Sequence, residues 1–268
     1  MNCNHVRFVG GGRWATIVLT ELVQAFPNLK VDWVCHTSVA NKIKFVKNHT
    51  LYKNVNPVDN NNIGELLQPD KVIIASHSSQ HCSDLKIHGN CGTDVLIEKP
   101  LFPAFLDFNT LSEFDLNRIF INTEFYNAYF VSDFFNEIKL LDLNNIEIFW
   151  HDPLTETRNS EESKCSEIYS SIFMDQLLHV MSILKLMEFD IKNYSRVKIT
   201  INKDSQHKGI KISCNFGSTK ISISLSRFAD QRERKIVVNN GISSLDFSSK
   251  PLIKKIGQCK SCLLYTSP

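Results

Sequence analysis

A glycine-rich turn near the amino terminus is the feature that most constrains how this chain can fold. Gly10-Gly11-Gly12-Arg13-Trp14-Ala15 directly follows an apolar run at residues 6–9 and directly precedes a stretch of helical periodicity. This is the pattern G-x-G-x-x-A in the strand-to-helix context that the dinucleotide fingerprint requires. Gly10 would permit the tight turn, and Gly12 would let the backbone approach a pyrophosphate. The amides of Arg13 and Trp14 would face its phosphates at the helix start.

The first half of the chain alternates short apolar runs with amphipathic stretches, which is typical of parallel strands joined by crossover helices. Strands are predicted at residues 6–9, 30–35, 54–58, 71–75, 94–97 and 119–121, and helices at about 14–25, 39–47, 63–67 and 81–88. Gly89 is expected to end the last of these helices as a left-handed cap. The predicted unit is a doubly wound Rossmann domain over residues 1–120.

The second half has a different periodicity. A helix is predicted at 128–140, a strand at 146–150, a polar surface loop or lid at 152–164, a helix at 167–187, and further strands at 196–202, 210–216, 220–226, 235–238 and 242–247. Period-two runs such as Ile221-Ser222-Ile223-Ser224-Leu225 indicate an antiparallel sheet with one buried face. The predicted fold class is therefore α/β: the Rossmann domain, then an α+β domain at 121–257 with an open, mainly antiparallel sheet. Residues 258–268 are interpreted as a tail that need not be native sequence.

Composition restricts the kind of partner. The formal net charge is +2 and 43% of the residues are hydrophobic, which favours a small-molecule substrate over nucleic acid or an anionic membrane. Neither a run of about 20 apolar residues nor a secretory leader is present, so a cytoplasmic protein is expected. Cys259 and Cys262 form a lone C-x-x-C pair without further ligands, and no metal site is predicted.

The end of the second predicted strand bears on the choice of cofactor. It reads Cys35-His36-Thr37-Ser38 and lacks the acidic residue that would bond the ribose hydroxyls of NAD. Thr37 and Ser38 could instead hydrogen-bond a 2′-phosphate, with Arg13 or Lys42 supplying charge. NADP is favoured over NAD, although a helix cap with a solvated lysine is the alternative reading of the same residues.

Two further features carry candidate chemistry. Asp175 and His179 are spaced i, i+4 in a strongly apolar helix, so both could point into one cleft as a proton relay. Lys99 follows the predicted strand 94–97. It could bond the substrate hydroxyl and the nicotinamide ribose together and so stabilise developing alkoxide charge, which makes it a candidate for both catalysis and cofactor binding. The alternative interpretation is that Asp175 and His179 form a surface pair and that Lys99 is a surface lysine in a salt bridge.

Four segments together form a further pattern: the glycine turn, Asp70-x-Val72-Ile73-Ile74-Ala75 with His81 and Gly89 after it, Val95-Leu96-Ile97-Glu98-Lys99-Pro100-Leu101, and Asp175-x-x-x-His179. In these segments the chain resembles the glucose-fructose oxidoreductase and inositol dehydrogenase (Gfo/Idh/MocA) family. The resemblance spans roughly residues 5 to 250. The E-K-P tripeptide and the D-x-x-x-H pair are its more specific parts.

The resemblance implies NAD or NADP as cofactor and reversible oxidation of a hydroxyl on a sugar, cyclitol or related compound. By position, Lys99, Asp175 and His179 would be catalytic, while Ser76, His77, His81 and Glu98 would line the nicotinamide side of the cofactor. The resemblance further implies a homo-oligomer formed through the open sheet, and a carboxyl-terminal domain shorter than in most members. The Lys99–Pro100 bond is a candidate for a cis peptide. An NADPH-dependent imine reductase of the thiazolinyl type and an inactive, cofactor-binding sensor or scaffold remain alternatives.

Overall fold

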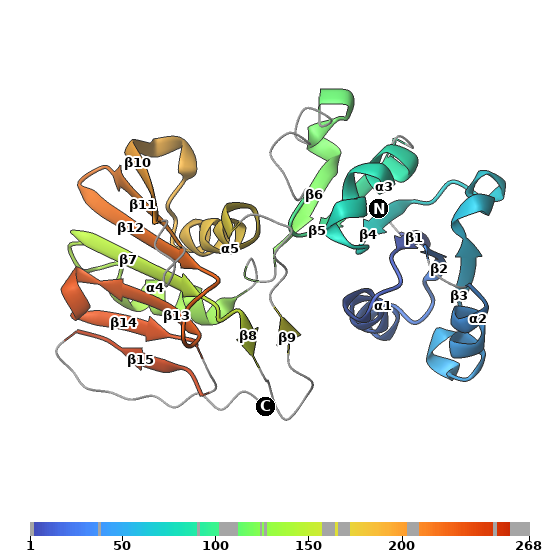
Figure 1. Ribbon diagram of the computed structural model, residues 1–268, viewed down its shortest axis with the longest axis horizontal. Coiled ribbons are helices and arrows are strands. Elements are labelled where there is room, and N and C mark those ends of the chain that lie inside the picture. Colours follow the sequence, from blue (N-terminus) through green and yellow to red (C-terminus); the bar gives the residue numbers. More distant parts are fainter. Residues whose placement is uncertain are drawn as a thin grey trace. The chain divides into compact units, whose positions relative to one another are not determined.

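The structure is a computed structural model that describes residues 3–36, 39–89, 92–101, 112–123, 125, 128–156, 164–165, 172–202, 209–248 and 251–257. The chain divides into two compact units, Met1–Asn122 and Thr123–Pro268 (Figure 1). Among the described helices, none has the length and apolar character needed to cross a membrane.

The first unit is built on a parallel sheet with the strand order β3-β2-β1-β4-β5-β6. Its strands are β1 (His5–Val9), β2 (Lys30–Cys35), β3 (Val55–Asp59), β4 (Lys71–Ile74), β5 (Asp94–Glu98) and β6 (Ile119–Asn122). Every pairing between these neighbours is parallel. Since the order reverses between β1 and β4, the sheet is doubly wound, and folds of this kind bind ligands beyond the carboxyl ends of these strands.

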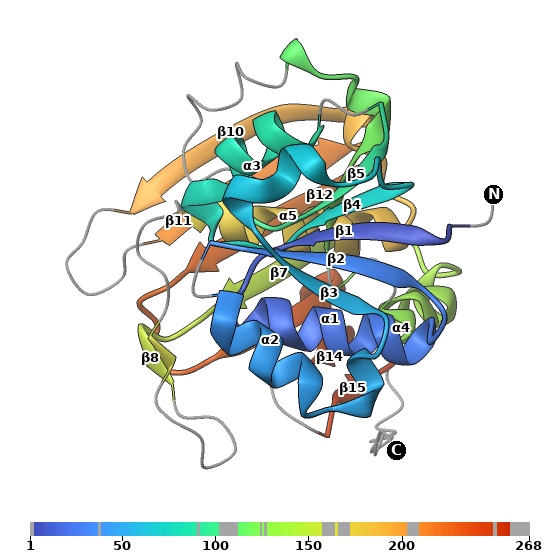
Figure 2. The same cartoon turned by 90° about the vertical axis from the view of Figure 1, so that its right-hand side faces the viewer.

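Helices cover both faces of this sheet because its strands alternate buried side chains between two cores. Figure 2 shows α1 (Arg13–Ala25) and α2 (Val39–Lys47) on one face and α3 (His81–His88) on the other. Val6 and Phe8 pack toward α1, whereas Val9 packs with Leu85 of α3. The predicted strands and these three helices are confirmed to within one or two residues. At residues 63–67, where a short helix was expected, the chain instead forms a 3-10 helix, Asn60–Glu65.

The second unit contains a mostly antiparallel sheet with the order β10-β11-β12-β7-β13-β14-β15. Its strands are β7 (Asn145–His151), β10 (Tyr194–Asn202), β11 (Gly209–Phe216), β12 (Thr219–Ser226), β13 (Glu233–Val238), β14 (Ser243–Asp246) and β15 (Ile253–Lys255). Only the β12–β7 pair among them is parallel. The core lies on one face, where α4 (Tyr129–Ile138) and α5 (Ile172–Leu186) pack on apolar side chains such as Ile148 and Ile223. The predicted α/β fold class is therefore confirmed.

Several local predictions differ from the structure. Gly89 does cap α3, but with a right-handed φ of −81°, so the predicted left-handed cap is wrong. Glycine is required at this position for a different reason, because a Cβ would lie 2.8 Å from a methyl carbon of Leu85. Strand β15 was not predicted.

The predicted polar loop 152–164 is only partly described. Its ends form a short two-stranded ribbon, β8 (Thr155–Glu156) with β9 (Lys164–Cys165), and residues 157–163 lie outside the described residues. The same holds for 166–171, so the predicted start of the following helix at residue 167 is not described; α5 is seen from Ile172.

Candidate active site

The glycine turn joins β1 to α1 and needs glycine at Gly10 for two reasons. Its φ is +136°, a conformation that side chains with a Cβ rarely adopt, and a Cβ would lie 2.6 Å from the carbonyl carbon of Ala75. The turn is also tied to the next strand, because the amide of Gly10 donates to the carbonyl of Val34 at 2.9 Å. The loops after β1 and β4 therefore approach each other as closely as their backbones allow.

Gly12 occupies the N-cap position of α1 and leaves the helix start open. Within the described part of the chain, no side chain caps the helix there, and no atom beyond the two neighbours of Gly12 in the chain lies within 4 Å of a Cβ built on it. The first turn of the helix contains no acidic residue. Ala15, one turn further on, is fully buried against the sheet. Uncapped amides at a helix N-terminus attract anions, and the open space allows a phosphate to approach. These residues fit the pyrophosphate of a dinucleotide.

The side chains of β2 and α2 hold the other side of the turn. The indole N–H of Trp33 donates to the Gly10 carbonyl at 2.6 Å, and Lys42 Nζ donates to the Gly11 carbonyl at 2.9 Å. The same ammonium lies 4.7 Å from the centre of the Trp33 ring. Lys42 thus places a positive charge beside the turn. Burial raises the pKa of Cys35 to about 11 despite the nearby Lys42, so this thiol stays protonated near neutral pH.

His36, at the end of β2, makes a contact that could not be predicted from the sequence. Its Nε2 lies 2.9 Å from Oδ1 of Asp84, a fully buried carboxylate on α3, and the other oxygen of Asp84 accepts a hydrogen bond from the Ser76 hydroxyl. The imidazole at the end of β2 is therefore held by a residue from the opposite helix layer. Thr37 and Ser38, predicted to contact a 2′-phosphate, lie outside the described residues.

The ends of β4 and β5 are linked by His81. Its ring is buried, with Nδ1 2.8 Å from the carbonyl oxygen of Pro100 and Nε2 3.0 Å from that of Ser76. His81 therefore holds the two loops together at this edge of the sheet, and its place beside the cofactor stays a prediction. His77 is exposed and accepts a hydrogen bond from the amide of Ser79 through Nδ1.

Lys99 follows β5 at the same edge of the sheet as the glycine turn. The residue before it, Glu98, is buried and accepts a hydrogen bond from the side chain of Asn122 on β6. Lys99 itself is half-buried, and the Lys99–Pro100 peptide is cis, as predicted. Because β1, β4 and β5 are parallel, their carboxyl ends bring Gly10, Ser76 and Lys99 to one edge.

In the second unit, His179 is buried in an aromatic setting. Its ring stacks on Trp150 with centroids 4.7 Å apart and planes inclined by 12°, and it meets Phe125 edge-on at 5.4 Å. Asp175, one helical turn earlier, receives a hydrogen bond of 2.7 Å from Arg227, whose side chain is almost fully buried. The predicted pair thus packs against side chains from β7, from the segment before α4 and from the loop after β12, which confines the positions that both groups can take.

A second ion pair lies beside the same aromatic ring. Arg234 donates to both carboxylate oxygens of Asp152, at 2.9 and 3.3 Å, and its guanidinium carbon lies 4.3 Å from the Trp150 ring centre. Gln176 of α5 donates to Asp152 at 3.3 Å. Arg227, Arg234 and Trp150 were not predicted as parts of the site, because their partners come from distant parts of the sequence.

The two groups of candidate residues belong to different units. Lys99 and the glycine turn lie in Met1–Asn122, and Asp175 and His179 lie in Thr123–Pro268. Their convergence on one substrate remains a prediction. Within the described residues, no group of three or more His, Cys, Asp or Glu side chains could hold a metal ion; Cys259 and Cys262 lie outside them.

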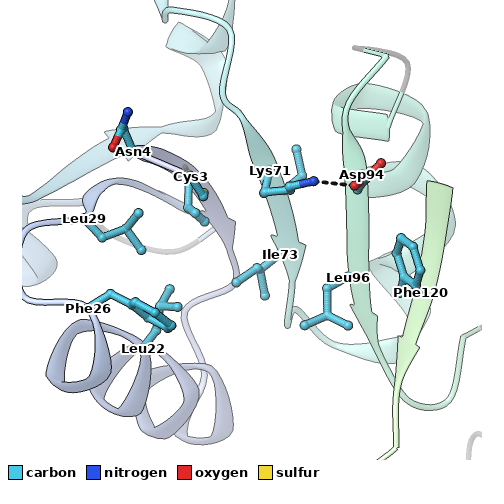
Figure 3. A pocket seen from close by; sticks show the side chains of 12 residues that line it. Cys3, Asn4, Leu22, Phe26, Leu29, Lys71, Ile73, Asp94, Leu96 and Phe120 are labelled. Atoms are coloured by element: carbon cyan, nitrogen blue, oxygen red, sulfur yellow. Dashed lines mark hydrogen bonds and ion pairs between the residues drawn. The ribbon is translucent and has the colours of Figure 1, made fainter. Parts of the chain in front are cut away.

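A cavity of about 700 Å³ in the first unit lies away from the carboxyl ends of the strands. It lies over the sheet beside α1, between Leu22 of α1 and Phe26 directly after it on one side and Ile73, Leu96 and Phe120 of the strands on the other (Figure 3). The ion pair between Lys71 and Asp94 marks its position at the amino ends of β4 and β5. A dinucleotide bound at Gly12 would lie at the opposite ends of the strands, so this cavity is not the predicted cofactor site.

Solved structures share this fold at low sequence identity. A myo-inositol 2-dehydrogenase from Lactobacillus plantarum matches 97% of this chain and 84% of its own, with a TM-score of 0.65 and 14% identity. A myo-inositol dehydrogenase from Corynebacterium glutamicum matches 95% of this chain and 75% of its own, with a TM-score of 0.64 and 15% identity. The WlbA dehydrogenase from Bordetella pertussis, solved in complex with NADH and UDP-GlcNAcA, matches 91% of this chain and 73% of its own, with a TM-score of 0.62 and 12% identity.

These structures are dehydrogenases of the kind that the sequence resemblance indicates, and at such identities the likeness establishes the fold. No family model matches the sequence, and no curated protein matches it.

Proposed function

We propose that this protein is an NAD(P)-dependent oxidoreductase that transfers a hydride between nicotinamide and a carbinol or ketone carbon of a sugar, cyclitol or related small molecule. The observation that carries the proposal is the open, uncapped start of α1 at Gly12, at the carboxyl edge of a doubly wound sheet that also presents Lys99. The dehydrogenases that share the fold support it, including one solved with NADH.

The residues of the first unit would hold the cofactor by its phosphates and adenosine ribose. The α1 amides after Gly12 would bind the pyrophosphate. Lys42 and His36 supply donors near the end of β2, and no acidic side chain follows that strand in the sequence to repel a 2′-phosphate. We therefore favour NADP over NAD. When bound, the nicotinamide supplies or accepts the hydride.

The proposed chemistry assigns one role to each candidate side chain. His179 takes the proton from the carbinol as the hydride leaves, since a neutral imidazole is a base suited to neutral pH. Asp175, held by Arg227, orients the substrate hydroxyl or the imidazole. Lys99 stabilises the negative charge that develops on the oxygen. The packing of His179 against Trp150 and Phe125 excludes water from one side of the imidazole.

The test is turnover with NADPH and NADH against a panel of ketoses, oxidised cyclitols and cyclic imines, followed by the absorbance of the reduced nicotinamide. Oxidation of the nicotinamide with a ketone is expected. Turnover with imines alone would instead support the imine reductase, and tight cofactor binding without turnover would support the sensor.

We predict that Lys99→Ala and His179→Ala each lower turnover at least about a hundredfold while cofactor affinity changes little, because each removes a group that acts only in the reaction. Steady-state kinetics and a cofactor titration measure the two effects separately. Lys86→Ala, on the exposed side of α3, is the matched control for removing a lysine. Unchanged turnover in either site variant would refute that residue's role.

A further inference from the structure

Three arginines gather at the carboxyl end of β7 in the second unit. Arg227 directly follows β12, Arg232 directly precedes β13, and Arg234 lies on β13 opposite Trp150 of β7. Strand β12 is parallel to β7 and β13 is antiparallel to it, so all three arginines lie at the end of the sheet where β7 stops. Asp152, the residue after β7, lies at the same end.

These three cations share two carboxylates. Arg227 binds Asp175 at 2.7 Å. Asp152 accepts hydrogen bonds from Nη2 of Arg234 at 2.9 and 3.3 Å, and Nε of Arg232 lies 3.6 Å from the same carboxylate. The side chains of Arg227, Arg232 and Arg234 are 5%, 16% and 15% exposed, so water screens their charges only in part. These five side chains together carry an excess of one positive charge.

The acidic residues nearest in sequence do not balance this charge. Glu233, between Arg232 and Arg234, points to the opposite face of the sheet because side chains alternate along a strand, and it contacts His151 there at 3.0 Å. Asp230, in the loop before β13, is exposed to solvent. Positive charge in a largely buried setting is costly unless an anion compensates it. A bound anion would stabilise the arginine group.

The arginine group adjoins the proposed base, on the face of the sheet that packs against α5. The centre of the Trp150 ring lies 4.7 Å from that of His179 and 4.3 Å from the guanidinium carbon of Arg234. Asp175, the partner of Arg227, precedes His179 by one turn of α5. A cation and the proposed base therefore contact the same indole, and a molecule as small as a monosaccharide can span the two.

Two buried polar atoms beside Asp152 have the bonding capacity that a hydroxy acid would use. Both contacts of Arg234 with Asp152 come from Nη2, and its Nε has no hydrogen-bond partner within the described part of the chain. Gln176, 1% exposed, donates through Nε2 to Asp152 and to the carbonyl of Ser226, which leaves its Oε1 without a donor among the described residues. A carboxylate accepts from a guanidinium, and a hydroxyl donates to an amide oxygen.

We propose that the substrate is a sugar acid or a related polyol acid, whose carboxylate is bound by Arg232 and Arg234. This inference rests on the function proposed above and narrows its substrate class to compounds that carry a carboxylate. Planar guanidinium groups suit a carboxylate because they donate two hydrogen bonds at once. The carboxylate takes no part in the reaction: the carbinol carbon gives a hydride to the oxidised nicotinamide, and its hydroxyl gives a proton to His179.

The experiment compares compounds that differ only in the carboxylate: D-glucuronate with D-glucose, D-galacturonate with D-galactose, and D-gluconate with D-glucitol. Binding is titrated calorimetrically with and without NADPH, which cannot react with an alcohol, and turnover is followed with NADP⁺ and NAD⁺. The acid of at least one pair is expected to exceed its neutral partner at least about tenfold in affinity and in kcat/KM, because hydrogen bonds between charged groups contribute that much.

Arg232→Met and Arg234→Met are expected to reduce this preference at least about fivefold, because each removes a cation that faces the carboxylate. The ratio compares two ligands in one preparation, so a partly unfolded variant lowers both values and leaves the ratio unchanged. Arg196→Met is the matched control, since Arg196 is exposed on β10, and it should keep the preference. Melting temperatures show whether each variant folds.

The outcomes separate this inference from the function on which it rests. Equal binding of acids and neutral partners, absence of binding by every acid, or a preference that survives in both Arg232→Met and Arg234→Met would overturn it. Turnover of neutral sugars without preference for acids would also overturn it and would leave the proposed oxidoreductase standing. Preferential binding of an acid without turnover by either nicotinamide would support the carboxylate site and count against the oxidoreductase.

Discussion

At the scale of single residues, the glycine turn makes two different demands on two glycines. A side chain at Gly10 would combine a positive φ with a backbone clash. A Cβ at Gly12 would keep an ordinary φ of −75° and, apart from its neighbours in the chain, would meet no atom of the described residues within 4 Å. Gly10 is therefore needed for the fold. The fold does not require glycine at position 12, so the space beside Gly12 can serve a ligand.

We predict that Gly10→Ala destabilises the protein by at least about 2 kcal/mol and that Gly12→Ala costs no more than about 1 kcal/mol, the ordinary effect of changing an N-cap. Urea denaturation of both variants at neutral pH measures the difference. Equal losses of stability would mean that the backbone of the turn is not as described.

His88 is a buried titratable residue whose environment has a measurable consequence. Its side chain is fully buried on α3, and neither ring nitrogen has a hydrogen-bond partner within the described part of the chain. Burial, with smaller contributions from Arg7 and His36, lowers the pKa of His88 to about 4 from an ordinary value of 6.5. The folded protein therefore keeps this imidazole neutral where the unfolded chain already binds a proton.

Between pH 6.5 and 4 the unfolded state binds more protons at this site, so the contribution of His88 to stability falls as the pH falls. From pH 7 to pH 5 we predict a loss on the order of 2 kcal/mol from this residue. His88→Leu should lose correspondingly less stability over the same interval. Denaturant midpoints of both proteins at the two pH values test this, and identical losses would exclude His88 as the cause.

At the scale of secondary-structure elements, α5 depends on the loop after β12 for its charge balance. Arg227 in that loop is almost fully buried and binds Asp175 near the start of the described helix, across 52 positions of sequence. A hydrogen bond between two charged groups in such a setting is stronger than a neutral one, and removing one partner leaves the other charge poorly solvated. Arg227 is therefore a positioning residue for Asp175.

We predict that Arg227→Met lowers the free energy of unfolding by about 1–3 kcal/mol and turnover by at least about tenfold. Arg227→Lys should restore most of the turnover, because a single guanidinium nitrogen makes the contact with Asp175. Unchanged turnover in folded Arg227→Met, despite its lower stability, would limit Arg227 to a structural role.

Elements with a clear period were predictable from the sequence, and contacts between distant segments were not. The apolar runs at β1 and β2, the alternation at β12 and the helical spacing at α1 and α2 reflect local geometry, which the sequence of one segment displays. The capping conformation of Gly89 could not be read in this way, because its glycine is required by contact with Leu85 and not by φ. The same is true of His36 with Asp84 and of Arg227 with Asp175, where neither sequence neighbourhood indicates the partner.

At the scale of the whole molecule, the second unit offers two unlike faces of one sheet. The face under α4 and α5 is apolar, while one row across the other face runs through Lys211, Ser224, Phe149 and Lys235. Obligate homodimer interfaces are richer in apolar side chains than this row. Association of two copies through this face of the sheet stays a prediction. The polar side chains of this row indicate that such an interface would contain water.

The central claim is that the start of α1 binds a nicotinamide dinucleotide by its phosphates. Isothermal titration calorimetry of NADPH and NADH against the unmodified protein and Gly12→Glu tests it most directly. A carboxylate at this position is favourable for the helix itself and repels a pyrophosphate, so the variant should fold but not bind. The account predicts saturable binding of one dinucleotide per chain, tighter for NADPH, and its loss in Gly12→Glu. Absence of binding to the unmodified protein, or equal binding by the variant, would contradict it.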